Sequence, residues 1–106
     1  MKRRSLLPLA ALLLAAALPL AARAATHTIT IEGMKFSPET VTVKAGDRIV
    51  WNNKDVVPHT ATAKGAFDSG SIATGKSWSH AAPNKPGTYD YVCTFHPGMK
   101  ATLVVQ

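Results

Sequence analysis

The sequence predicts an all-β domain, a sandwich or a barrel, and three observations support that prediction. From residue 26 onward, short runs of β-branched and aromatic residues alternate with clusters of Gly, Pro, Asn and Asp. No stretch of ten or more residues in this part repeats apolar side chains at the 3.6-residue period of a helix. About seven to eight short strands fit into residues 25–106, which is typical of one small sandwich or barrel domain.

The expected strands follow one another at short intervals. Residues 28–31 alternate Thr with Ile, and residues 40–43 alternate Thr with Val, which is the two-residue period of a half-buried strand. Gly33 ends the first run, and a Lys-Ala-Gly-Asp turn leads from the second into the third. We expect an irregular stretch over residues 64–75. The remaining strands are expected at residues 48–52, 59–63, 76–81, 88–94 and 101–105.

Residues 1–24 are predicted to be a secretory signal peptide. Lys2, Arg3 and Arg4 precede an apolar run over residues 6–20, and small residues at Ala22 and Ala24 suit a signal peptidase. The run is shorter than the roughly 20 residues of a spanning helix, so no stable membrane anchor is expected after cleavage. We expect a soluble, periplasmic mature chain of residues 25–106. The general secretory and twin-arginine routes both stay open.

The charge of the mature chain argues against nucleic acid as a partner. The whole sequence has a formal charge of +6, with 12 basic and 6 acidic residues. Four of the basic residues lie within residues 1–24, so eight remain against six acids and the charge falls to +2. The remaining basic residues are scattered singly and form no stripe that could follow a phosphate backbone.

The chemistry is expected around Cys93, the single cysteine of a chain bound for an oxidising compartment. An exported thiol without a partner in its own chain is buried and inert, awaits a partner chain, or is protected by a bound ligand. Cys93, His96 and Met99 form a C-x-x-H-x-x-M pattern between two predicted strands, and His59 at the start of an earlier strand can supply a fourth donor. Thiolate, thioether and imidazole together suit copper.

Each of these side chains alone has a simpler interpretation. Cys93 could be a small buried hydrophobe, His96 a loop residue and Met99 a filler of the core. The combination is harder to obtain by accident. Structural zinc sites rarely use methionine, and a two-copper centre would need a second cysteine, so the sequence favours one mononuclear copper ion.

These residues resemble the cupredoxins, the small blue copper proteins, and most closely the plastocyanin and amicyanin branch. The C-x-x-H-x-x-M loop has the short amicyanin spacing. The motifs that follow the order of that family are Phe36-Ser37-Pro38, residues 43–47, Trp51-x-Asn53, Pro58-His59, residues 86–91 and residues 93–99. The resemblance implies a Greek-key β-sandwich with copper at one end, two histidines and a cysteine as ligands, and methionine as a long axial contact.

The resemblance also implies a function, single-electron shuttling by Cu(I)/Cu(II) cycling. No enzymatic activity is expected, because a copper oxidase or nitrite reductase needs a second, substrate-binding copper and usually a much longer chain. Transient redox partners would dock on a small apolar patch formed by Pro58, Phe95, His96 and Pro97, and the protein would be a monomer. Thr60 replaces the asparagine that often follows the first histidine and helps to tie the two ligand loops together in the family. Thr60 can offer only a hydroxyl beside the ligands, so the loop rigidity and the reduction potential are expected to differ. Val92 stands directly before Cys93, where plastocyanins have a tyrosine through which electrons pass to a remote surface site. That second route for electrons is therefore not expected here. A periplasmic copper carrier or buffer with the same ligands is the alternative.

His27 carries a separate hypothesis. If cleavage follows Ala24, the mature chain begins Ala25-Thr26-His27, and its amine, two amide nitrogens and imidazole could wrap a second Cu(II) in a square plane. This requires a frayed first strand.

Overall fold

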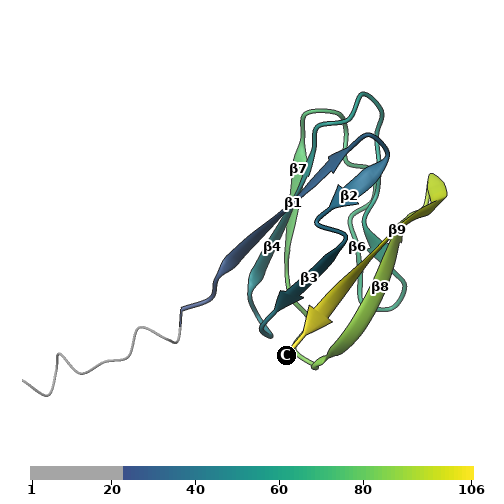
Figure 1. The fold of residues 1–106 in the computed structure, drawn as a ribbon. Helices are drawn as coiled ribbons and strands as arrows, with labels where there is room; N and C mark the ends of the chain where they lie inside the picture. The colour runs from purple at the N-terminus through teal and green to yellow at the C-terminus, as the bar shows by residue number, and fades with distance from the viewer. Residues whose placement is uncertain (1–22) are drawn as a thin grey trace, which may run out of the picture.

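The computed structural model describes residues 23–106, so most of the predicted signal peptide lies outside the described residues. Residues 23–106 form nine strands and no helix, which confirms the all-β prediction (Figure 1). None of the described residues belongs to a helix that could cross a membrane. The strands are β1 (Thr26–Glu32), β2 (Lys35–Ser37), β3 (Thr40–Val43), β4 (Arg48–Asn53), β5 (Thr62–Ala63), β6 (Phe67–Asp68), β7 (Ser77–Ala81), β8 (Gly87–Cys93) and β9 (His96–Val105).

The strands form two sheets that face each other as a sandwich. One sheet has the order β2-β1-β4-β7 and the other has the order β3-β9-β8-β5-β6. The chain passes repeatedly from one sheet to the other, so β1 pairs with β4 and β3 pairs with β9 in parallel, while the other pairs are antiparallel. Such crossings are typical of the expected Greek-key sandwich.

The core lies between the sheets because alternate residues of the long strands point inward. In β1 the inward residues are Ile29 and Ile31, and in β4 they are Ile49 and Trp51, all at most 1% exposed. From the opposite sheet Tyr91 and Leu103 complete the same layer. Trp51 meets Tyr91 edge to face, with ring centroids 5.8 Å apart. This packing supplies a rigid base for the end of the sandwich at which β8 turns into β9.

The structure corrects several expected boundaries. The short strands β2 and β6 were not predicted, and β5 covers only the end of the expected strand over residues 59–63. β6 lies inside the stretch 64–75 that was expected to be irregular. β9 begins at His96 rather than at residue 101, because the β8–β9 pairing continues to Cys93 and His96 past a bulge at Val92 and Cys93. A β-bulge bends a strand without ending its ladder.

Candidate metal centre

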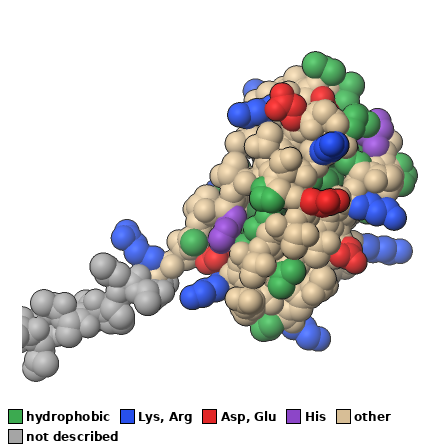
Figure 2. All heavy atoms as spheres, viewed as in Figure 1, with side chains coloured by type: hydrophobic (Ala, Val, Ile, Leu, Met, Phe, Trp, Pro, Cys, Tyr) green, Lys and Arg blue, Asp and Glu red, His purple; other side chains and the backbone are tan. Residues whose placement is uncertain are grey.

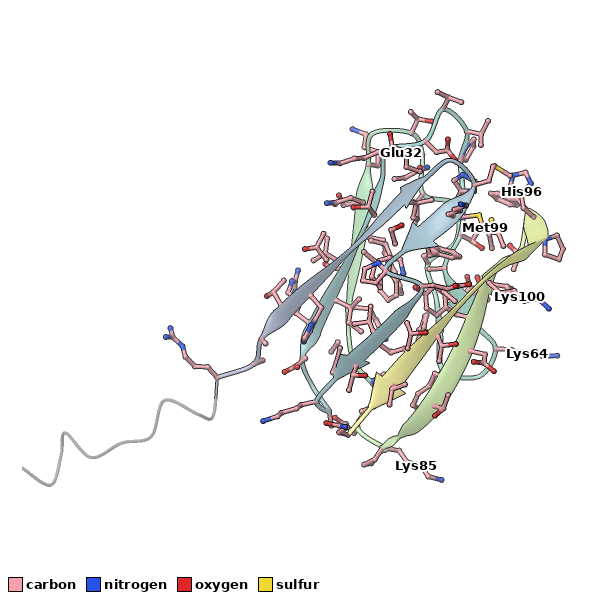
Figure 3. All side chains as sticks on the ribbon, viewed as in Figure 1. Glu32, Lys64, Lys85, His96, Met99 and Lys100 are labelled. Atoms are coloured by element: carbon pink, nitrogen blue, oxygen red, sulfur yellow. The ribbon has the colours of Figure 1, made fainter. Side chains whose placement is uncertain are left out.

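The candidate ligands gather at the end of the sandwich where β8 meets β9. Cys93 is the last residue of β8 and His96 the first of β9, and only Thr94 and Phe95 separate them. The region predicted to be a loop is therefore a tight hairpin end, in which Cys93 pairs directly with His96. Figure 3 shows His96 and Met99 close together at the tip of β9.

His59 reaches the same point from the opposite part of the chain. Its backbone pairs with Ile72 in an isolated bridge, with its N–H donating to Ile72 O at 3.2 Å and its carbonyl accepting from Ile72 N at 2.7 Å. The His59 and Cys93 side chains are both fully buried. His59 Nδ1 lies 3.6 Å from Cys93 Sγ. Two residues 34 apart in the sequence thus present a nitrogen and a sulfur to one buried point.

The orientation of the His59 ring is set by Asp55. His59 Nε2 lies 2.8 Å from Asp55 Oδ2. An ionised carboxylate only accepts hydrogen bonds, so Nε2 carries the proton and the lone pair of Nδ1 faces Cys93. Hydrogen bonding from the Met34 backbone and from His59 lowers the pKa of Asp55 to about 2, which keeps it ionised. A carboxylate behind a histidine ligand is a common arrangement in metal sites.

Asp55 is itself held in place by buried and partly buried hydrogen bonds. Its Oδ2 accepts from Met34 N at 2.9 Å and its Oδ1 accepts from Val56 N at 3.0 Å. Asn53 Oδ1 accepts from Asp55 N at 2.9 Å, while Asn53 Nδ2 donates to the carbonyls of Val57 and Ile72. The segment between β4 and His59 therefore has little freedom, because each polar group of Asn53 is used to fix it.

Thr60 links the His59 segment to the Cys93 hairpin. Its backbone N–H donates to Cys93 Sγ at 3.3 Å, and its Oγ1 accepts from Thr94 N at 2.8 Å. The Thr60 and Thr94 hydroxyls are also 3.1 Å apart, within hydrogen-bonding distance. The threonine hydroxyl therefore ties the His59 segment to the Cys93 hairpin, and Thr94 is a partner that the sequence did not indicate.

His96 and Met99 lie beside this pair. The His96 ring packs against the His59 ring with centroids 5.3 Å apart and an interplanar angle of 61°, and Met99 is buried. The described residues hold no group of three or more His, Cys, Asp or Glu side chains in metal-ligand geometry. The donor-to-donor contact that the structure shows is that of Cys93 with His59, and the His96 ring lies beside His59.

The donor set and its spacing fit a copper ion. Metal bonds of about 2.3 Å to sulfur and about 2.0 Å to nitrogen, at tetrahedral to trigonal angles, separate the two donors by roughly 3.5 to 3.7 Å. The 3.6 Å between Cys93 Sγ and His59 Nδ1 matches this separation. A buried thiolate, imidazoles and a thioether suit copper better than the oxygen-seeking cations.

The surface around this end is unusually apolar. Val56, Phe95 and Met34 are the exposed large hydrophobic residues of the described chain, at 86%, 49% and 43% exposure. Pro58 and Pro97 are also exposed, and His96 is half-buried between them and the interior. Figure 2 shows apolar side chains gathered at this end next to a histidine. Met34 and Val56 are thus exposed apolar residues outside the predicted patch of Pro58, Phe95, His96 and Pro97.

Sequence reasoning missed four residues of this end: Asp55, Thr94, Met34 and Val56. A signal existed for Asp55, because it stands four residues before His59 in the turn Asp-Val-Val-Pro-His. The sequence held no comparable signal for Met34, because only the β1–β2 turn brings its backbone N–H to Asp55.

The structure does not show the frayed first strand that the His27 hypothesis requires. His27 lies in β1, paired with Ile49, and its Nε2 is 2.9 Å from Asp47 Oδ2. The square-planar Cu(II) arrangement would require Thr26 and His27 to leave the ladder with β4. The hypothesis of a second copper site at Ala25-Thr26-His27 is therefore not supported by this geometry.

This chain combines a β-sandwich with a buried Cys–His donor pair at one end, and that combination is typical of small mononuclear copper proteins. The sequence model described as the cupredoxin-like domain matches residues 5–105. The chain therefore belongs to the cupredoxin-like family, and the predicted copper, fold and electron-transfer class are confirmed at that level.

Individual relatives agree with this assignment. The chain is 35% identical to amicyanin-alpha of Methylorubrum extorquens over 91 residues, 80% of this chain and 76% of that protein. It is 36% identical to plastocyanin of Scenedesmus fuscus over 85 residues, 67% of this chain and 86% of that protein. A solved amicyanin variant in its reduced Cu(I) form superposes with a TM-score of 0.69 at 28% identity, covering 81% of this chain and 88% of that chain.

Proposed function

We propose that this protein is an exported carrier of single electrons whose copper ion is held by His59, Cys93, His96 and Met99. The observation that carries the proposal is the buried contact of 3.6 Å between Cys93 Sγ and His59 Nδ1, backed by Asp55. Copper, when bound there, supplies a one-electron couple. The protein supplies donors from β8, from β9 and from the segment that precedes β5.

The ligand surroundings favour electron transfer because they resist rearrangement. Cys93 Sγ accepts a backbone hydrogen bond from Thr60, and His59 is held by Asp55 and by its bridge to Ile72. Donors that cannot move keep nearly one geometry for both oxidation states, so little reorganisation accompanies the gain or loss of an electron. A hydrogen bond to the cysteine sulfur also tunes the reduction potential.

Electrons would enter and leave at His96. Its ring is half-buried while its neighbours Phe95 and Pro97 are exposed, so it connects the buried donors to the apolar surface. A partner that docks on this patch would need no access to Cys93. Weak redox encounters bury little area, which fits a monomer with transient protein partners.

Export to the periplasm is part of the same proposal. It is supported by the basic, apolar and small-residue pattern of residues 1–24 and by the lone Cys93, which is buried and therefore protected in an oxidising compartment.

The test is a visible absorption spectrum of the purified protein titrated with Cu(II). We expect an intense blue thiolate-to-copper band that saturates at one equivalent and bleaches with a mild reductant. Cys93→Ser should lose the band, whereas Thr102→Val, which removes an exposed hydroxyl bonded to Asp90, should keep it. Colourless binding in the unsubstituted protein would contradict the proposed ligand set.

The same preparation distinguishes an electron carrier from a copper carrier. An electron carrier should exchange electrons between its Cu(I) and Cu(II) forms much faster than it releases copper to a chelator. The reverse order of rates would favour the carrier or buffer function.

A further inference from the structure

The end of the sandwich remote from the copper ligands contains a second buried carboxylate, Asp47. Its Oδ1 accepts from the backbone nitrogen of Ala25 at 3.1 Å. Its Oδ2 accepts from Lys44 N at 3.0 Å and lies 2.9 Å from His27 Nε2. Asp47 is only 6% exposed, and a cavity of about 290 Å³ beside it is lined by Ala25, Lys44 and Gln106 among others.

Ala25 is the first described residue whose backbone bonds to the body of the domain. Its nitrogen donates to Asp47 and its carbonyl accepts from Arg48 N at 2.9 Å. Arg23 and Ala24 before it are exposed, and in Figure 1 this part of the chain leads away from the sheets. Cleavage after Ala24 therefore removes no contact of Ala25 with the domain.

Cleavage changes the chemistry of that nitrogen. Water adds across the Ala24–Ala25 peptide bond, Ala24 leaves with a carboxylate, and the freed amine of Ala25 takes up a proton. A neutral amide donor thereby becomes an ammonium group with three donors and a positive charge, at the same point beside a carboxylate. Charge-assisted hydrogen bonds are about twice as strong as neutral ones.

We infer that Asp47 is a binding site for the mature N-terminus, which receives the α-ammonium of Ala25 after the signal peptide is removed. This inference rests on the proposed export and cleavage and not on the copper site. The site is specific for one cleavage position, because a cut one residue away moves the amine by about 3.8 Å. It also keeps the amine and the His27 ring from wrapping Cu(II).

Before cleavage Arg23 also lines the cavity, and it leaves with the signal peptide. In the mature chain the charges around the site are few. The β3–β4 turn carries Asp47 and Lys44, and the Lys44 side chain is exposed. The Arg48 guanidinium on β4 donates to Ser79 Oγ at 2.7 Å and therefore points away from Asp47. His27 on β1 contacts the other carboxylate oxygen, and Gln106 borders the cavity from β9. Asp47 is thus the carboxylate side chain that faces Ala25.

The pairing of the Ala25 ammonium with Asp47 predicts the direction in which the pKa of the ammonium shifts. The ammonium should be harder to deprotonate in the folded protein than in the unfolded chain, where an α-amine has a pKa of about 7.7–8.0. The stabilisation is then fully present below that pH and is lost as the pH rises through the higher folded value.

The test uses the mature protein purified from the periplasm, with its N-terminus established by intact mass. The α-amine is titrated by following the ¹³C shift of the Ala25 methyl group between pH 6 and 11 (about the range that brackets an α-amine). We expect a midpoint at least one pH unit, tenfold in proton affinity, above that of the urea-unfolded chain. Asp47→Asn should abolish that shift, whereas Asp90→Asn, at an exposed carboxylate on β8, should preserve it.

A chain with one extra glycine ahead of Ala25 tests whether the amine must stand at Ala25. Its terminal amine should have the same midpoint as the amine of the unfolded chain. An unshifted amine in the protein that begins at Ala25 would overturn the inference, as would a second tight Cu(II) equivalent lost in His27→Ala. A mass that places the N-terminus elsewhere would instead refute the cleavage prediction. The blue band of the copper centre should survive Asp47→Asn, so failure of the two proposals can be told apart.

Discussion

The two ends of this sandwich use the same local arrangement for different purposes. Asp55 accepts from two backbone nitrogens and contacts the Nε2 of His59, and Asp47 accepts from two backbone nitrogens and contacts the Nε2 of His27. Backbone hydrogen bonds, with a histidine contact adding to them, lower the pKa of each carboxylate from 3.8 to about 2.

The difference lies in what the other side of each imidazole faces. His59 is fully buried and turns Nδ1 toward Cys93 Sγ at 3.6 Å, whereas the His27 side chain is 28% exposed and lies beside the start of β1. A buried carboxylate paired with a histidine is therefore not a metal site by itself. Such a pair becomes a metal site where the fold also places a soft donor, here the Cys93 sulfur, beside the histidine.

Matched substitutions at the two carboxylates should give the largest contrast. Asp55→Asn removes the charge that orients His59 and should weaken copper binding by roughly 10- to 100-fold, the usual loss for a partner of a ligand. Asp47→Asn should leave copper affinity unchanged, because it contacts no ligand. Competition titrations with a Cu(I) chelator measure both. Equal losses would show that the two ends are coupled.

Thr60→Val tests the link between the ligand segments. It removes the hydroxyl that accepts from Thr94 N at 2.8 Å while keeping the shape of the buried side chain. We expect the free energy of unfolding to fall by about 1–2 kcal/mol, because Thr94 N loses its partner. Urea denaturation measures it, with Thr102→Val as the exposed-site control. A loss no larger than the control's would mean that the hydroxyl is dispensable.

The loss of folding stability at acid pH should depend on the charge of Asp47. Because the pKa of this carboxylate is lower in the folded protein, its stabilising contribution is present above about pH 4 and is lost as the pH falls toward 2. The difference in urea midpoint between the unsubstituted protein and Asp47→Asn should therefore shrink over that interval. A difference that is constant from pH 6 to pH 2 (about two units either side of the ordinary carboxyl pKa) would contradict a charged Asp47.

The smallest effect is expected at Tyr91, in the core between the two ends. Its hydroxyl is buried without a hydrogen-bond partner of ordinary geometry, the Trp51 indole N–H being its polar neighbour, and burial raises the pKa of Tyr91 to about 12. Tyr91→Phe removes no hydrogen bond, so the free energy of unfolding should stay the same or rise by less than about 1 kcal/mol. Thermal denaturation of the metal-free protein checks this. A clear loss of stability would point to a partner for the hydroxyl.

The sequence by itself determined the fold class and the donor types. Period-two alternation in residues 28–31 and 40–43 specified strands, because a strand with one buried face needs an apolar side chain at every second position. Cys93, His96 and Met99 were visible as a group because they lie within seven residues. The order of strands in the two sheets did not follow from these local patterns.

Only the tertiary structure decided how distant residues meet. The contact of His59 with Cys93, the hydrogen bond from the Met34 backbone to Asp55 and the hold of Asp47 on Ala25 join residues 20 or more apart in the sequence. Local alternation fixes which side chains face inward, but not which strands become neighbours. The pairing of β1 with β4 and of β8 with β9 sets those distances, and with them the chemistry of each end.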